Sequence, residues 1–124
     1  LHETGRQGLC RIVMIHHPPV PGLAIARKAL KDSQHFAHCI AREGAEMVLH
    51  GHIHTSTLSS LPGPAGAVPV LGIASASALS RDPLRAAAWN RIAITPRDGG
   101  YRLGVTRRFF PAAGAAGTTQ ETIF

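Results

Sequence analysis

Residues Glu46–Thr57 read Glu-Met-Val-Leu-His-Gly-His-Ile-His-Thr-Ser-Thr, and this stretch decides the predicted fold. Met47–Leu49 is an apolar run typical of a strand, and it leads into Gly51. On extended backbone His52 and His54 stand at positions i and i+2, so their side chains share a face with Cα atoms about 6.6 Å apart. Two imidazoles at that spacing can bind one metal ion, or one each of two ions about 3.5–4 Å apart. A strand that ends in exposed histidines is the competing interpretation.

A second histidine pair follows another predicted strand, which covers Leu9–Ile15. This run is rich in β-branched residues and almost continuously apolar, as in a buried strand of a parallel sheet. Pro18 and Pro19 lack a backbone N–H, so the strand ends before them. His16 and His17 therefore lie just past its C-terminal end, where ligands bind in open α/β sheets.

A helix is predicted between these two strands, over Ser33–Glu43. Asp32 suits the N-cap, and Gly44 suits the position after the last turn. A longer helix that starts near Leu23 is the alternative. A right-handed strand–helix–strand crossover places the ends of the two strands side by side. We therefore expect three histidines to converge at one edge of the sheet: His16, His52 and His54.

The rest of the chain predicts three more strands and a tail. Thr55–Ala67 is rich in Ser, Pro and Gly and indicates a loop, and Val68–Ala76 follows as a strand. Ala88–Thr95 and Tyr101–Phe109 predict a hairpin through an Asp-Gly turn. We therefore predict an α/β fold with a mixed sheet of about five strands and one main helix over residues 1–110. Residues 111–124 are expected to form a flexible tail.

Composition and charge narrow the class of protein. The chain of 124 residues has 13 Lys and Arg against 7 Asp and Glu, a formal net charge of +6 that favours an anionic, phosphate-bearing substrate. A solvated basic surface is the competing interpretation. The basic residues are scattered and only 5% of the residues are aromatic, which argues against nucleic acid as a partner.

The sequence carries no membrane-length apolar run and no signal-peptide pattern. Cys10 and Cys39 are too few for a disulfide framework and are interpreted as reduced thiols. We therefore expect a cytoplasmic protein that does not bind membranes. Because the first residue is leucine, we also expect a longer parent chain.

Together, the two histidine motifs resemble those of the calcineurin-like metallophosphoesterases, most closely the bacterial cyclic-nucleotide phosphodiesterase group. His16-His17-Pro18-Pro19 is similar to the His-His-Pro-Pro of that group, and Gly51-His52-Ile53-His54 is similar to its Gly-His-x-His. Leu71–Ala78 resembles the strand that follows. The resemblance covers about residues 10–108 and corresponds to the C-terminal half of the family's αββα sandwich.

This resemblance implies a metal-dependent phosphoesterase that hydrolyses phosphodiesters, cyclic nucleotides or similar, by attack of a metal-bound hydroxide. His16 and His52 would bind one metal ion and His54 the other, so these three are the expected catalytic and metal-binding residues. Two divalent ions, of manganese, iron or zinc, would be bound in the full-length parent. His17 and His50 are either hydrogen-bond partners of the ligands or structural, and we favour the structural interpretation.

The family's acidic motifs are absent from this chain. It contains no Asp-x-His, no Gly-Asp-x-x-Asp and no Gly-Asn-His-Asp/Glu. Two divalent ions so close together need bridging carboxylate charge. We therefore expect at most one metal ion in this chain alone, and little activity without the N-terminal half of the same fold. That half, or a second copy in a homodimer, would cover the apolar strands.

Two other functions stay open. The first is a non-catalytic module that binds a partner or itself and keeps vestigial histidines. The second is a mononuclear zinc hydrolase with three histidines. Three basic residues between the first strand and the helix also allow two interpretations. They either reach a phosphate group of the substrate or form a basic helix face: Arg27, Lys28 and Lys31.

Overall fold

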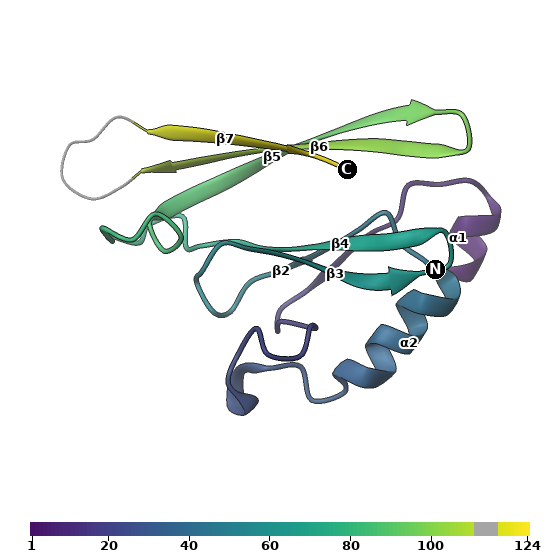
Figure 1. The fold of residues 1–124 in the computed structure, drawn as a ribbon, viewed down its shortest axis with the longest axis horizontal. Coiled ribbons are helices and arrows are strands. Elements are labelled where there is room, and N and C mark those ends of the chain that lie inside the picture. The colour runs from purple at the N-terminus through teal and green to yellow at the C-terminus, as the bar shows by residue number, and fades with distance from the viewer. Residues whose placement is uncertain (111–116) are drawn as a thin grey trace. The chain divides into compact units, whose positions relative to one another are not determined.

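A computed structural model describes residues 1–110 and 117–124. The chain divides into two compact units, and each contains its own β-sheet (Figure 1). The first unit consists of Leu1–Ile53 and Thr57–Gly72, and the second of His54–Ser56 and Ile73–Phe124. In the described residues, no helix combines the length and apolarity that a bilayer crossing requires.

The first unit contains a four-stranded mixed sheet with the strand order β1-β2-β4-β3. Strands β1, β2 and β4 are parallel, and β3 pairs with β4 in the antiparallel direction. The elements of this unit are α1 (His2–Arg6), β1 (Ile12–Ile15), the 3₁₀ helix η1 (Ala26–Lys28), α2 (Ser33–Glu43), β2 (Met47–His50), β3 (Thr57–Gly63) and β4 (Gly66–Gly72).

Helix α2 packs against the sheet of this unit and forms part of its hydrophobic core. Ile40 is fully buried and clusters with Val48 and Val70 of the sheet, while Phe36 and Ala37 pack against the same cluster. These helix positions are three and four residues apart, which is the spacing of one face of a helix. The predicted helix is confirmed, with the bounds that the sequence indicates.

The second unit contains a three-stranded antiparallel sheet with the order β5-β6-β7. Its strands are β5 (Ala87–Arg97), β6 (Gly100–Phe110) and β7 (Thr118–Ile123). Strands β5 and β6 form the predicted hairpin. Its turn contains Gly99 with a φ of 76°, a backbone conformation that glycine adopts without a steric cost.

The predicted α/β class, with a mixed sheet and one main helix, is confirmed. It is consistent with half of the sandwich that the resemblance implies. The five predicted strands are divided between two sheets instead of one. Strand β3 occupies the predicted loop over Thr55–Ala67, because Pro62 lies on an edge strand and needs no N–H partner there. Of the predicted tail, 111–116 lie outside the described residues and 118–123 form β7.

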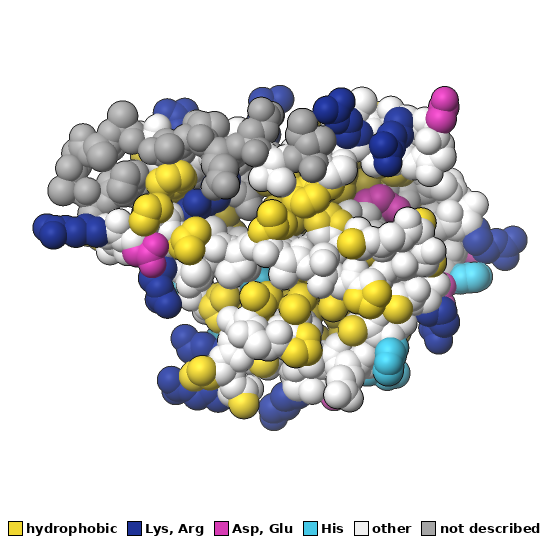
Figure 2. Space-filling view, in the orientation of Figure 1, with side chains coloured by type: hydrophobic (Ala, Val, Ile, Leu, Met, Phe, Trp, Pro, Cys, Tyr) yellow, Lys and Arg dark blue, Asp and Glu magenta, His cyan; other side chains and the backbone are white. Residues whose placement is uncertain are grey.

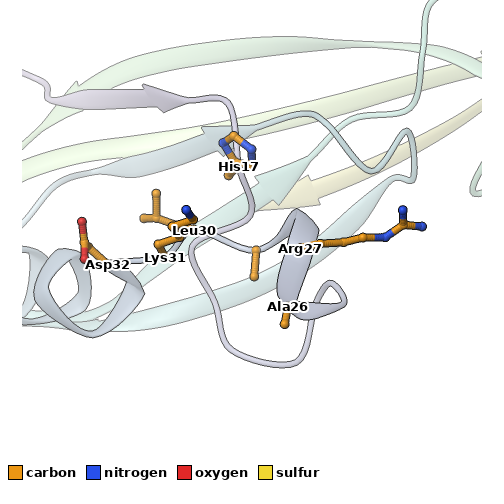
Figure 3. A pocket seen from close by; sticks show the side chains of 7 residues that line it. His17, Ala26, Arg27, Leu30, Lys31 and Asp32 are labelled. Carbon is orange, nitrogen blue, oxygen red and sulfur yellow. The ribbon is translucent and has the colours of Figure 1, made fainter.

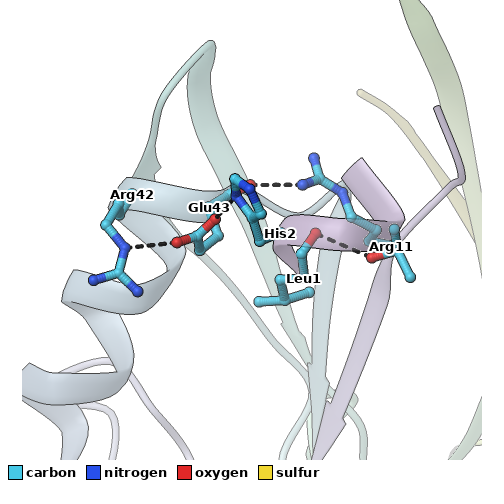
Figure 4. A network of polar contacts seen from close by, with 6 residues as sticks. Leu1, His2, Arg11, Arg42 and Glu43 are labelled. Carbon is cyan, nitrogen blue, oxygen red and sulfur yellow. Dashed lines mark hydrogen bonds and ion pairs between the residues drawn. The ribbon is translucent and has the colours of Figure 1, made fainter. Parts of the chain in front are cut away.

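An ion pair joins the chain at the starts of β1 and β2. The Arg11 guanidinium donates from Nη2 to Glu46 Oε1 at 2.9 Å and from Nε to Oε2 at 3.2 Å, and the Arg11 backbone N–H donates to the same carboxylate. Arg11 Nη1 also donates to the Glu43 carbonyl at 2.6 Å. The Glu43 carboxylate in turn pairs with His2 and Arg42 (Figure 4). These contacts hold the strands in the register Ile12↔Met47.

We expect Glu46→Gln to lower the free energy of unfolding by about 1–3 kcal/mol at neutral pH, because Arg11 then loses its charged acceptor. Burial acts to raise the pKa of the Glu46 carboxyl, but the hydrogen bonds and charge of Arg11 outweigh burial and lower the pKa. A lowered folded-state pKa stabilises the fold above the unfolded-state pKa, and this stabilisation is lost as the pH falls through the folded-state pKa.

Urea denaturation at neutral and acidic pH measures both effects. The wild-type chain should lose stability on acidification below about pH 4.5, and Glu46→Gln should lose less. Glu3→Gln, at an exposed acid of α1, is the control and should behave like the wild type. An equal loss of stability on acidification in Glu46→Gln and the wild type would contradict a stabilising role of the Arg11–Glu46 ion pair.

Candidate functional site

Three imidazoles of the first unit lie together just past the C-terminal ends of β1 and β2. We call His16, His17 and His52 the histidine cluster. Nε2 of His16 lies 2.9 Å from Nδ1 of His52, a hydrogen-bond distance. The ring centroids are 5.0 Å apart for His16 and His17, 4.7 Å for His16 and His52, and 4.5 Å for His17 and His52. Two residues 36 positions apart in sequence are thus brought into contact.

Parallel pairing of β1 with β2 brings His16 and His17 close to His52. The register pairs Ile15 with His50, and the Gly51 N–H donates to the His16 carbonyl at 3.2 Å, so the pairing continues past both strand ends. Pro18 and Pro19 are fully buried, which fixes the backbone that leaves the cluster. The expected meeting of His16 and His52 is observed, and their role as metal ligands stays a prediction.

The backbone after β2 differs from the sequence prediction. Strand β2 ends at His50, and the next residues are not extended. His52 has a φ of 67° and His54 a φ of 51°, both in the left-handed region. The Ile53 N–H donates to the Gly51 carbonyl at 2.8 Å, which closes a three-residue turn around His52. The prediction that His52 and His54 share one face of an extended strand is therefore wrong.

The predicted ligand His54 is exposed and belongs to the second unit. The cluster of the first unit instead includes His17, which the sequence analysis interprets as structural. No sequence signal distinguishes His17 from a structural histidine, because its place in the cluster depends on packing around the buried Pro18. A role for His54 as a ligand stays a prediction from the resemblance.

His50 is a buried histidine next to the histidine cluster in sequence. It is buried at the end of β2, with Nδ1 3.2 Å from the Gly51 carbonyl and Nε2 3.4 Å from Thr57 Oγ1. Burial lowers the pKa of His50, and the hydrogen bond with the Gly51 carbonyl opposes this with a smaller effect. A Cβ at Gly72 would lie 2.6 Å from Cε1 of His50, so this close approach of β4 requires glycine. A neutral, structural His50 agrees with the favoured interpretation.

The chemistry of the donors fits a metal site only in part. Two nitrogens on a tetrahedral zinc ion, each about 2.05 Å from the metal, are about 3.4 Å apart, so His16 and His52 need to separate by only about 0.5 Å to share an ion. Within residues 1–110 and 117–124, however, no group of three or more His, Cys, Asp or Glu side chains is arranged to hold a metal ion. The described chain therefore offers a pair of imidazole ligands and no carboxylate beside them.

The basic charge of the chain is spread widely. In the face drawn in Figure 2, lysine and arginine side chains (dark blue) are scattered instead of forming one stripe. This distribution agrees with the absence of any long block of like charges in the sequence. A positive field of this kind favours an anionic substrate without indicating a track for a nucleic acid.

Comparison with known proteins gives a similarity of structure and none of sequence. No family model matches the sequence, and no curated protein matches it. The fold is similar to that of a Vps29 double mutant from Entamoeba histolytica. The TM-score is 0.49 and the sequence identity 10%, and the match covers 83% of this chain and 52% of that chain.

This chain therefore spans about half the length of the solved structure that it matches. The similarity, with a TM-score of 0.49, carries no assignment of family or function. Membership of the bacterial cyclic-nucleotide phosphodiesterase group stays a prediction that depends on the two histidine motifs.

Proposed function

We propose that this chain supplies the histidine side of a metal-dependent phosphoesterase site, which in the full-length parent hydrolyses phosphodiesters such as cyclic nucleotides. The main support is the 2.9 Å separation of His16 Nε2 and His52 Nδ1 at the ends of two neighbouring parallel strands. His16 is exposed, so packing of the core does not require it. An exposed imidazole pair at this edge of a sheet suits ligand binding better than stability.

The residues of the site would have distinct roles. His16 and His52 would hold one divalent metal ion, of manganese, iron or zinc, and by the resemblance His54 would hold a second. Such a pair of ions supplies Lewis-acid activation of water and stabilises charge on the phosphoryl oxygens. His17 packs against both rings of the pair and would limit their movement. The carboxylate ligands would come from the N-terminal half of the same fold.

The free edge of the first sheet supports binding of the N-terminal half of the fold. Strand β1 pairs with β2 on one side, and among the described residues no strand pairs with its other side. Met14 on this strand is 78% exposed. An unpaired strand edge beside an exposed apolar side chain pairs readily with an added strand. We propose the N-terminal half of the parent as that partner, and a homodimer is the alternative occupant.

We expect the purified 124-residue chain to bind no more than one zinc ion, through His16 and His52. Either His16→Ala or His52→Ala should weaken zinc affinity by at least about tenfold, because one of two converging nitrogen ligands is lost. Competition with a chromogenic chelator measures the affinity, and mass spectrometry under native conditions gives the stoichiometry.

His38→Ala is the matched control, since His38 is an exposed histidine on α2 outside the cluster. This variant should keep the wild-type affinity. Unchanged zinc affinity in both cluster variants would exclude the proposed pair, and two tightly bound ions per chain would show that other residues complete the site.

A further inference from the structure

A pocket of about 270 Å³ lies beside the histidine cluster, within the first unit. His17 forms one wall, and residues between Ala26 and Asp32 form the others (Figure 3). His17 belongs both to the pocket and to the histidine cluster, where its ring centroid lies 4.5 Å from that of His52. A group bound in the pocket would therefore be a close neighbour of any group bound at His16 and His52.

Backbone hydrogen bonds hold the pocket walls in place. The Leu30 N–H donates to the Pro18 carbonyl at 3.1 Å, which ties the second wall to the segment that follows His17. The Lys28 N–H donates to the Ile25 carbonyl at 2.8 Å within the turn of η1. Because Pro18 is fully buried, this anchor is part of the core. The pocket is thus largely formed before any ligand binds, as is usual for small-molecule sites.

Charged side chains at the pocket are not used elsewhere in the fold. Neither Arg27 nor Lys31 has a hydrogen-bond or ion-pair partner among the described residues. Asp32 precedes α2, but its side chain makes no capping hydrogen bond. Arg27 extends away from the other labelled side chains in Figure 3. Lys28 is a further cation of η1, and it does not line the pocket.

We propose that this pocket binds a second anionic group of the substrate, of the size and charge of a phosphate, next to the phosphodiester held at the histidine cluster. The inference rests on the proposed function. Lys31 would act as a point charge on this group. The substrate class is then a diester with an additional charged group, such as a pyrophosphate diester. A cyclic nucleotide carries one phosphate and would leave the pocket without its anion.

The test uses the metal-free 124-residue chain and inorganic phosphate as the probe, at constant ionic strength. Backbone amide shifts in nuclear magnetic resonance spectra report the affinity, and they also show that each variant is folded. Lys31→Ala should weaken phosphate binding about tenfold, the effect of one lost charge-assisted hydrogen bond. Lys28→Ala, the matched control, should change it less than about twofold. Asp32→Asn should strengthen binding, because it removes the one negative charge of the pocket.

Equal affinity in the wild type, Lys31→Ala and Lys28→Ala would overturn the proposal, as would the absence of phosphate-induced shifts around His17 and Leu30. Binding that appears only after zinc is added, and that Lys31→Ala does not change, would place the anion at the metal and also overturn it. The zinc affinities of His16→Ala and His52→Ala are measured without phosphate. The two proposals can therefore fail separately.

Discussion

His52→Ala is expected to lower the turnover of the parent protein, in which this chain is joined to its N-terminal half, by more than about 100-fold. Loss of a hydrogen-bond partner behind a metal ligand already costs about 10–100-fold, and loss of the ligand itself should cost more. His52 meets His16 at 2.9 Å through one turn of left-handed backbone, so the substitution removes one nitrogen of the pair. The measurement is kcat for a chromogenic phosphodiester with manganese, together with the metal content of each variant.

His38→Ala is again the control, and it should keep both turnover and metal content. The 124-residue chain without the N-terminal half should be nearly inactive. At 4 Å two dications repel each other by about 4 kcal/mol even in bulk water, and this chain offers no bridging carboxylate to offset that repulsion. Turnover by the isolated chain comparable to that of the parent, or full activity of His52→Ala, would show that the site is made by other residues.

Ile40→Ala should produce the largest loss of stability among single substitutions in the first unit, about 3–5 kcal/mol. Ile40 has 0% of its surface exposed and touches the cluster that includes Val48 and Val70. Truncation removes buried methyl groups and leaves a cavity between α2 and the sheet. Small domains are stable by only about 5–15 kcal/mol, so this single change should unfold a large part of the population under mild denaturant.

Ile25→Ala tests whether the effect comes from burial. It makes the same chemical change at a side chain that is 59% exposed, and it should cost less than about 1 kcal/mol. Urea denaturation followed by far-ultraviolet circular dichroism compares the two variants. A similar cost at both positions would contradict the place of Ile40 in the core.

Much of the first unit could be predicted because its residues repeat with a clear period. The apolar side chains of α2 recur three and four residues apart, and Leu9–Ile15 is apolar except for Arg11, so the helix and the strand could be predicted directly. Strand β3 was missed because Pro62 and its polar neighbours read as a loop. Its place at the edge of the sheet depends on pairing with β4, which a single stretch of sequence does not encode.

The site was predictable in one part and not in another. His16 and His52 follow strands that were recognised as parallel neighbours, so their meeting could be expected. The turn at Gly51–His54 could not, because histidine adopts a positive φ more often than most residues but still only rarely. His17 joins the histidine cluster, and Lys31 lines the pocket whereas Lys28 does not. Both facts depend on tertiary packing around Pro18, which the sequence pattern does not reveal.

The left-handed backbone at His52 and His54 implies a trade-off between stability and activity. A residue other than glycine costs about 1–2 kcal/mol in that conformation. Glycine at either position would relieve the strain, and asparagine would tolerate it well. Selection for thermal stability alone should therefore replace these histidines, whereas selection for function should keep them. In a library screened for both thermal stability and activity, substitutions at positions 52 and 54 should raise one property and lower the other.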